Sequence, residues 1–175
     1  RIPRPQTGAE WGVVTGLAMT GIFLYALCFF YGLKHITAGQ GALVVALNPV
    51  VVALAAWFLG QEKMTPLKLG GIAIAMAGCL TVIGNGNPLA LISGSVGIGE
   101  WLILGCVMCW AAYTFIGRRA TRTLSPLAAT LWASLIGAAL IGTTALLQGG
   151  SDLAAWSWRV WTSIVFLAVG GTALA

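Results

Sequence analysis

Charged side chains are scarce in this sequence. Only 7% of its 175 residues are Asp, Glu, Lys or Arg, whereas 59% are hydrophobic. Soluble domains carry roughly a quarter charged residues. So few charges cannot cover a water-exposed surface, and the composition excludes an ordinary soluble protein. The mean hydropathy of +0.94 leads to the same conclusion.

Long runs without any charged residue are the main feature of the chain. A helix needs about 17 to 25 mostly apolar residues to cross a bilayer. Because each run approaches or exceeds this length, the sequence predicts an all-α, polytopic membrane helix bundle with six helices. The runs are Trp11–Leu33, Ile36–Gln61, Leu69–Gly99, Trp101–Gly117, Thr123–Ser151 and 160–175.

Motifs for nucleotide-driven or catalytic chemistry are missing. No G-x-x-x-x-G-K-[ST] segment is present to bind a nucleotide. The glycines of "SGSVGIG" have the wrong spacing for a serine-nucleophile turn or a dinucleotide loop. Cys106 and Cys109 form a C-x-x-C pair in mid-helix, but two further zinc ligands are missing nearby. We expect buried thiols there, and neither a cofactor nor a metal.

The formal charge of +5 comes from nine Lys and Arg residues scattered between the apolar runs. This scatter indicates membrane orientation rather than a nucleic-acid partner. If the N-terminal end is cytoplasmic, only Lys34 and Arg159 fall on the outer side. The basic residues on the cytoplasmic side are then Arg1, Arg4, Lys63, Lys68, Arg118, Arg119 and Arg122.

Capping residues predict where the helices begin. Thr7 with Glu10, and Thr37 with Gln40, have the spacing of a capping box. Further starts are predicted at Thr65-Pro66, Gly99-Glu100, Ser125-Pro126 and near Trp158, the first and third with proline at the first helical position. We expect the first helix to run to about Leu33 and the second to about Gly60. Small-residue stripes predict tight helix packing at Gly71, Ala75 and Gly78, and at Ser134, Ala138 and Gly142.

No acidic residue lies deep in a predicted span. Glu10, Glu62 and Glu100 are at helix ends and Asp152 is in a loop. A proton-coupled carrier usually places a carboxyl group within the membrane. If this protein is such a carrier, that carboxyl group would therefore lie in a helix outside the present sequence. Glu62 ends the second helix beside Lys63, the basic residue with which we expect it to pair, and we expect it to be structural or gating.

Polar and aromatic residues within the spans are the candidates for a solute path. Asn48 is near the middle of the second helix, and Pro49 removes a backbone donor there. Tyr25 lies mid-way along the first helix, and Trp110 and Tyr113 mid-way along the fourth. Interhelical packing and cavity lining remain open alternatives for Asn48.

Two segments resemble the EamA-type family of the drug/metabolite transporter superfamily. "YGLKHITAGQGALVVALNPVVVALAAWFLGQEKMTPLKLGGIAIAMAGCLTVIG" is similar to the later part of one repeat, with a tight hairpin, an Asn-Pro and a "GQEK" ending. "GEWLILGCVMCWAAYTFIGRRATR" is similar to the opening helix of the second repeat.

This resemblance implies a ten-helix carrier made of two inverted repeats, of which the present helices are the third to the eighth. Residues 1–87 would end the first repeat and 88–175 would begin the second. The start at Arg1 and the short last segment agree with a piece of a longer protein. The family's central cavity would be lined by Tyr25, Asn48, Trp110, Tyr113 and Thr172, with Pro49 and Glu62 in gating or structural roles.

The function implied is alternating-access transport, usually export, of a small metabolite, amino acid or drug-like compound. Its partners would be that solute and the lipid bilayer, with homodimerisation left open. The resemblance implies a location in a bacterial inner membrane. An intramembrane enzyme is the first alternative, but His35 lies at a span edge without a matching serine motif. A non-transporting membrane assembly subunit is the second.

Overall fold

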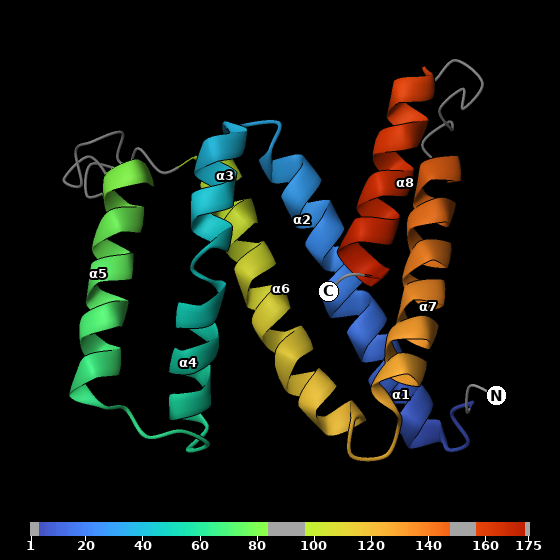
Figure 1. Ribbon diagram of the computed structural model, residues 1–175, viewed down its shortest axis with the longest axis horizontal. Helices are drawn as coiled ribbons and strands as arrows, with labels where there is room; N and C mark the ends of the chain where they lie inside the picture. The colour runs from blue at the N-terminus through green and yellow to red at the C-terminus, as the bar shows by residue number, and fades with distance from the viewer. Residues whose placement is uncertain (1–3, 84–96, 148–156, 174–175) are drawn as a thin grey trace. The chain divides into compact units, whose positions relative to one another are not determined.

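The computed structural model describes residues 4–83, 97–147 and 157–173. Within these ranges all regular structure is helical, and each predicted hydrophobic segment is present (Figure 1). Residues 84–96 and 148–156 lie outside the described residues, as do the side chains at 82–83 and 167–173.

The first segment consists of α1 (Gly8–Ala18), a π-helical turn η1 (Met19–Leu24) and α2 (Tyr25–Gly32). The predicted capping box is formed: Glu10 N donates to Thr7 Oγ1 (3.3 Å), and Thr7 N donates to Glu10 Oε2 (3.2 Å). The prediction of one regular helix to Leu33 was wrong in its middle, where the backbone widens into the π turn.

The second segment is also interrupted, into α3 (Ala38–Val45) and α4 (Asn48–Phe58). Its predicted capping box joins Thr37 and Gln40. At the interruption, Leu47 N bonds the carbonyl three residues back instead of four (3.0 Å). Pro49 has no N–H to give to the Val45 carbonyl, so the regular helix stops one turn before the proline. The sequence predicted the lost bond but not the break.

Glycine ends α4 in a left-handed conformation. Gly60 has φ +65°, a backbone region that costs a residue with a Cβ extra free energy. The Gly60 N–H bonds the Trp57 carbonyl (2.9 Å) and the Gln61 N–H bonds the Ala56 carbonyl (2.8 Å). These two bonds form a Schellman motif, which satisfies the last helical carbonyls.

The other helices are α5 (Pro66–Ile83), α6 (Ile98–Ala120), α7 (Pro126–Leu147) and α8 (Trp158–Ala173). Thr65 Oγ1 accepts from Lys68 N (3.4 Å), and Ser125 Oγ accepts from Ala128 N (3.3 Å), so both predicted caps are confirmed. The helix α6 begins one residue earlier than predicted and has no side-chain cap.

Four of these segments are long and apolar enough to cross a membrane: Gly8–Gly32, Ala38–Phe58, Ile98–Ala120 and Pro126–Leu147. The helix α5 is apolar but shorter over its fully described part, Pro66–Thr81. The chain is thus a multi-pass integral membrane protein with a helical bundle.

The chain forms two compact units, Arg1–Leu140 and Ile141–Ala175. In the first unit, α6 is the central helix: it contacts α1, η1, α2, α3 and α4, and lies between α2 and the α3–α4 segment (Figure 1). The helix α5 contacts α3. The second unit contains the end of α7 and α8.

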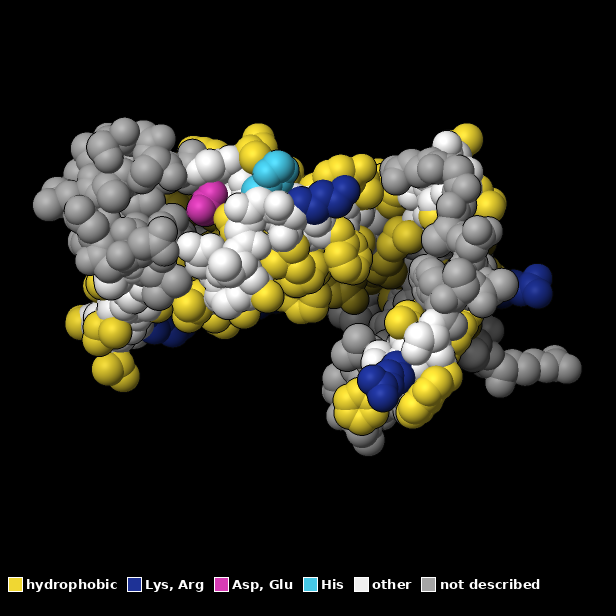
Figure 2. All heavy atoms as spheres, turned by 90° about the horizontal axis from the view of Figure 1, so that it is seen from above, with side chains coloured by type: hydrophobic (Ala, Val, Ile, Leu, Met, Phe, Trp, Pro, Cys, Tyr) yellow, Lys and Arg dark blue, Asp and Glu magenta, His cyan; other side chains and the backbone are white. Residues whose placement is uncertain are grey.

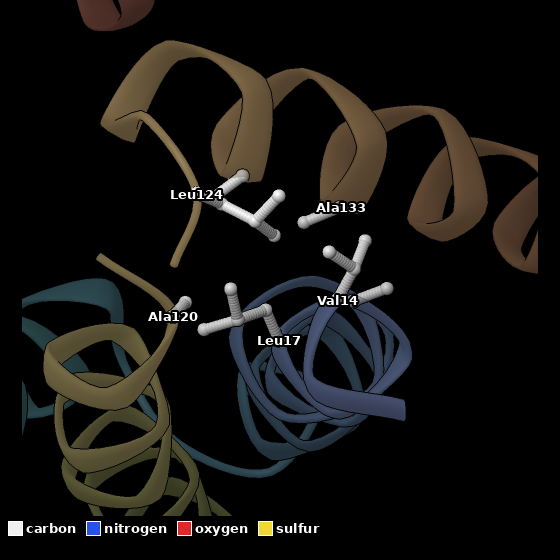
Figure 3. Close-up of a cluster of buried hydrophobic side chains, with 7 residues drawn as sticks. Val14, Leu17, Ala120, Leu124 and Ala133 are labelled. Carbon is white, nitrogen blue, oxygen red and sulfur yellow. The ribbon is translucent and has the colours of Figure 1, made fainter. Parts of the chain in front are cut away.

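One hydrophobic cluster joins α1 to the end of α6 and the start of α7 (Figure 3). Val14 and Leu17 of α1 point toward Ala133 of α7 and toward Ala120 and Leu124 at the α6–α7 connection. Small side chains allow these helices to approach closely, which is the main source of packing energy between helices in lipid.

The packed face of α7 differs from the predicted stripe. The buried residues of α7 are Ala128, Ala129, Ala133 and Gly137, and the last three are also spaced by four. Ser134 and Ala138 are exposed, and nothing lies within 4 Å of a Cβ built at Gly142. On α5, Gly71 and Gly78 likewise have open space around them. Both stripes were therefore wrong as packing faces within the described part of this chain.

Much of the described surface is hydrophobic (Figure 2). Seen from above, the histidine at the α2–α3 turn and a few charged side chains stand among yellow hydrophobic ones. Leu67 of α5 is 88% exposed and Phe58 of α4 is 78% exposed. Such side chains are stable against lipid or other membrane helices, but not against water.

Candidate functional site

Three of the predicted site residues form one aromatic cluster on α2 and α6. The ring of Trp110 lies 5.9 Å from the ring of Tyr25 and 5.5 Å from the ring of Tyr113, centroid to centroid. Tyr25 also stacks on Phe29, at 6.0 Å and 10°. The sequence predicted the three residues but not Phe29, whose i+4 spacing from Tyr25 could have indicated it.

Trp110 is placed at mid-membrane depth by its position in α6. It is near the middle of a helix that runs from Ile98 to Ala120, so it is far from both membrane interfaces, where tryptophans usually lie. Its side chain is 39% exposed. A partly exposed indole at this depth offers a ring face for stacking and an N–H donor.

Tyr113 and Thr114 extend this region toward the end of α6. Both line a pocket of about 220 Å³ together with Leu17, Gly117 and Thr130, among others. Trp110, Tyr25 and Asn48 do not line that pocket. Tyr113 thus belongs both to the aromatic cluster and to the lining of this pocket.

The π turn η1 lies directly before Tyr25 and contacts α6. Thr20 Oγ1 donates to the Gly16 carbonyl (2.8 Å), and this bond competes with the regular helical hydrogen bond to the same oxygen. At the other end of the turn, Cys106 Sγ donates to the Tyr25 carbonyl (3.5 Å). Single π turns in helices are frequent at functional sites. The sequence analysis missed this feature, for which Thr20-Gly21 is the only local signal.

Asn48 lies where the second segment is interrupted. Its Oδ1 atom is buried and has no hydrogen-bond partner among the described residues. Its neighbour Leu47 and Tyr25 of α2 both pack against one buried cluster, which consists of Val44, Cys79, Ile103, Cys106 and Val107. The two interrupted segments thus meet the same buried cluster. Interrupted helices at mid-membrane are typical of transporter binding sites.

Glu62 takes part in a polar network at one end of the molecule. Its carboxylate pairs with Lys68 Nζ (2.8 Å), so the predicted partner Lys63 was wrong. The turn after α4 brings Lys68, in the first turn of α5, back to this carboxylate. The hydrogen bond and charge of Lys68, and more weakly the charge of Arg118, lower the pKa of Glu62. Arg118 also donates to Gln61 Oε1 (3.5 Å) and stacks over Phe115.

The remaining candidates are structural or lie outside the description. Cys106 is fully buried in the α6 core, as predicted for a packed thiol, and Cys109 is partly buried. His35 is exposed in the α2–α3 turn. The side chain of Thr172 in α8 and the whole of Asp152 are not among the described residues.

Curated proteins with similar sequences are membrane transporters. The uncharacterized transporter YyaM of Bacillus subtilis is 33% identical over 153 residues, which cover 87% of this chain and 50% of that protein. A probable terminal-alkyne amino-acid exporter of Streptantibioticus cattleyicolor is 31% identical over 55% of this chain and 31% of its own length. The aromatic amino acid exporter YddG of Ancylobacter novellus is 26% identical over 58% of this chain and 36% of its own length.

The chain spans about half the length of the curated relatives that it matches over most of its residues. No solved structure gives a significant match. The EamA-like transporter family matches residues 1–84 and 97–175. These matches cover nearly the whole sequence, and the chain belongs to the EamA-like transporter family.

Proposed function

We propose that the full-length protein exports a small solute, such as a metabolite, an amino acid or a drug-like compound, by alternating access. The halves 1–87 and 88–175 would belong to two inverted repeats that rock about a site at mid-membrane depth. Family membership supports transport, and two relatives named as amino-acid exporters support this class of solute.

The aromatic cluster of Tyr25, Trp110 and Tyr113 is the observation that carries the assignment of the site. Two helices place these three rings together at mid-membrane depth, beside a π turn. The rings present faces that stack on an apolar or aromatic part of a solute, with an indole N–H and two hydroxyls as hydrogen-bonding groups. Asn48 would add a buried amide that has a free acceptor.

Trp110→Ala in the full-length protein tests this site. We expect the variant to reach the membrane in normal amounts, because Trp110 is partly exposed and outside the buried clusters. Loss of one stacking face should raise the KM of the transported compound by about tenfold or change the order of preference within a panel. The assay is uptake and efflux of amino acids and lipophilic cations in proteoliposomes.

Trp101→Ala is the matched control, since Trp101 is on the same helix but 62% exposed near its start. It should leave KM within about twofold of the wild type. An unchanged substrate profile in Trp110→Ala would show that Trp110 only packs. If Trp110→Ala failed to accumulate while Trp101→Ala reached normal amounts, this would also show that Trp110 only packs.

A further inference from the structure

Tyr113 lies against a glycine in the π turn. A Cβ built at Gly21 would be 2.6 Å from Cε2 and 2.8 Å from Cγ of the Tyr113 ring, and closer still to Cδ2. Contacts this short are not found between real atoms, and Cγ is at the root of the ring rather than at a flexible end. The ring can therefore occupy its observed place only because residue 21 has no side chain.

Gly16 provides a comparison on the same face. A Cβ at Gly16 would meet the side chain of Ile116 at 3.5 Å, an ordinary van der Waals contact. Gly16 and Gly21 face Ile116 and Tyr113 of α6, but they are five residues apart, not the four that keep one face of an α-helix. The π turn between Met19 and Leu24 accommodates this spacing.

The position of Tyr113 affects the rest of the aromatic cluster. Its ring is tilted by 34° to that of Trp110, which in turn contacts Tyr25 at 57°. If the Tyr113 ring rotated away from residue 21, its angle to Trp110 would change, because the two side chains share one helix. Gly21 in η1 thus determines the plane of the Tyr113 ring, and through that ring the space in front of Trp110.

We infer that Gly21 is a positioning residue, which fixes the Tyr113 ring through the π turn and thereby sets the solute preference of the aromatic cluster. This inference rests on the proposed function, since the cluster must contact the solute. Gly21 itself contributes no side chain to the solute. Its effect passes entirely through Tyr113.

The test compares Gly21→Ala, Gly16→Ala, Tyr113→Ala and the double variant Gly21→Ala/Tyr113→Ala in the full-length protein. The probe is the panel compound that the wild type moves fastest in proteoliposomes. We expect Gly21→Ala to raise its KM by about tenfold with the maximal rate per molecule within about twofold. Gly16→Ala should leave both values within about twofold. The KM of the double variant should equal that of Tyr113→Ala, because the two changes act through one ring.

Three results would overturn the inference. In the first, Tyr113→Ala raises the KM but Gly21→Ala leaves the KM within twofold of the wild type. This result would overturn the role of Gly21 and leave the proposed function intact. The second is additive effects in the double variant. The third is failure of the proposed function itself. It would appear as a wild type that moves no panel compound, or as an unchanged KM in both Tyr113→Ala and Trp110→Ala, which would contradict the proposed site as well. If Gly21→Ala does not accumulate, the double variant should recover normal amounts, because the steric conflict is gone; no recovery would also contradict us.

Discussion

Neighbouring side chains of α6 have different surroundings. Cys106 and Val107 are fully buried, while Trp110, one turn later, is 39% exposed. The buried residues pack the helix against α2 and the α3–α4 segment. We propose that this partly exposed ring is available to a solute.

Glu62 allows a prediction about pH. Lys68 lowers the pKa of Glu62, so the carboxylate is ionised at every pH above the ordinary pKa of a glutamate. The ion pair is lost only when the pH falls through this lowered pKa. We therefore expect that transport between about pH 5 and 8 does not depend on the protonation of Glu62. We expect Glu62→Gln to reduce flux by less than about fivefold, because the ion pair is half-exposed, and to leave the pH profile in place.

Lys68→Gln is the matched control for this prediction, since it removes the same ion pair from the other side. Both variants should have similar flux and the same pH profile when initial rates are measured across that range. A pH dependence that disappears in Glu62→Gln but persists in Lys68→Gln would make Glu62 a translocation carboxylate after all.

Among the elements, the crossing of α2 and α6 depends on two glycines. A Cβ at Gly99 would lie 2.6 Å from Ile36 Cγ2 and 3.2 Å from the Gly32 carbonyl oxygen. A Cβ at Gly32 would lie 2.7 Å from Ile103 Cδ1. The backbone oxygen cannot move without the helix, so the distance between these two helices is fixed by the absence of both side chains.

Gly99→Ala should therefore destabilise the protein by about 1–3 kcal/mol, through steric overlap in a packed crossing. Gly70→Ala in α5 is the control, because nothing lies within 4 Å of its Cβ position. There the same change should be neutral or stabilise the helix by up to about 1 kcal/mol. Thermal unfolding of the detergent-solubilised full-length protein measures both. Equal melting temperatures for the two variants would contradict the inference that Gly99 fixes the close crossing of α2 and α6.

Across the whole of the first unit, the described connections lie at two ends. Arg118 bonds Gln61, so the α4–α5 connection and the end of α6 lie at one end. The close approach of Gly99 to Ile36 brings the α2–α3 turn and the start of α6 together at the other. Within the first unit, α6 therefore runs from the end that holds the α2–α3 turn to the end that holds the α4–α5 connection. Most basic residues of the first unit gather at the first of these ends: Arg4, Lys63, Lys68, Arg118, Arg119 and Arg122.

The positive-inside rule then predicts that this basic end is cytoplasmic. Cysteines introduced singly at Arg119 and Lys34, in a full-length protein without its native cysteines, test the prediction. An impermeant thiol reagent added to intact cells should label Lys34→Cys at least about tenfold more than Arg119→Cys. Permeabilised cells provide the control, in which both should react. Labelling of Arg119→Cys in intact cells would reverse the assignment.

Local chemistry in the sequence was sufficient for the six segments, their caps and their order. Spans were readable because an apolar run satisfies its backbone hydrogen bonds only as a helix in lipid. Caps were readable because Thr7 with Glu10, and Thr37 with Gln40, bond within four residues of each other. Tyr25, Trp110 and Tyr113 could be predicted as mid-membrane candidates because the depth of a residue in a span follows from counting residues along the helix.

Only the tertiary structure decided which faces meet and where the helices deviate. The π turn involves a fit between Gly21 and Tyr113, which are distant in the sequence. The partner of Glu62 is Lys68 instead of the adjacent Lys63, because the turn after α4 reverses the chain. Two stripes of small residues on α7 have the same spacing, and packing against α1 selects only one of them. Helix periodicity gives several equivalent faces, and the choice among them depends on contacts between segments that no local pattern encodes.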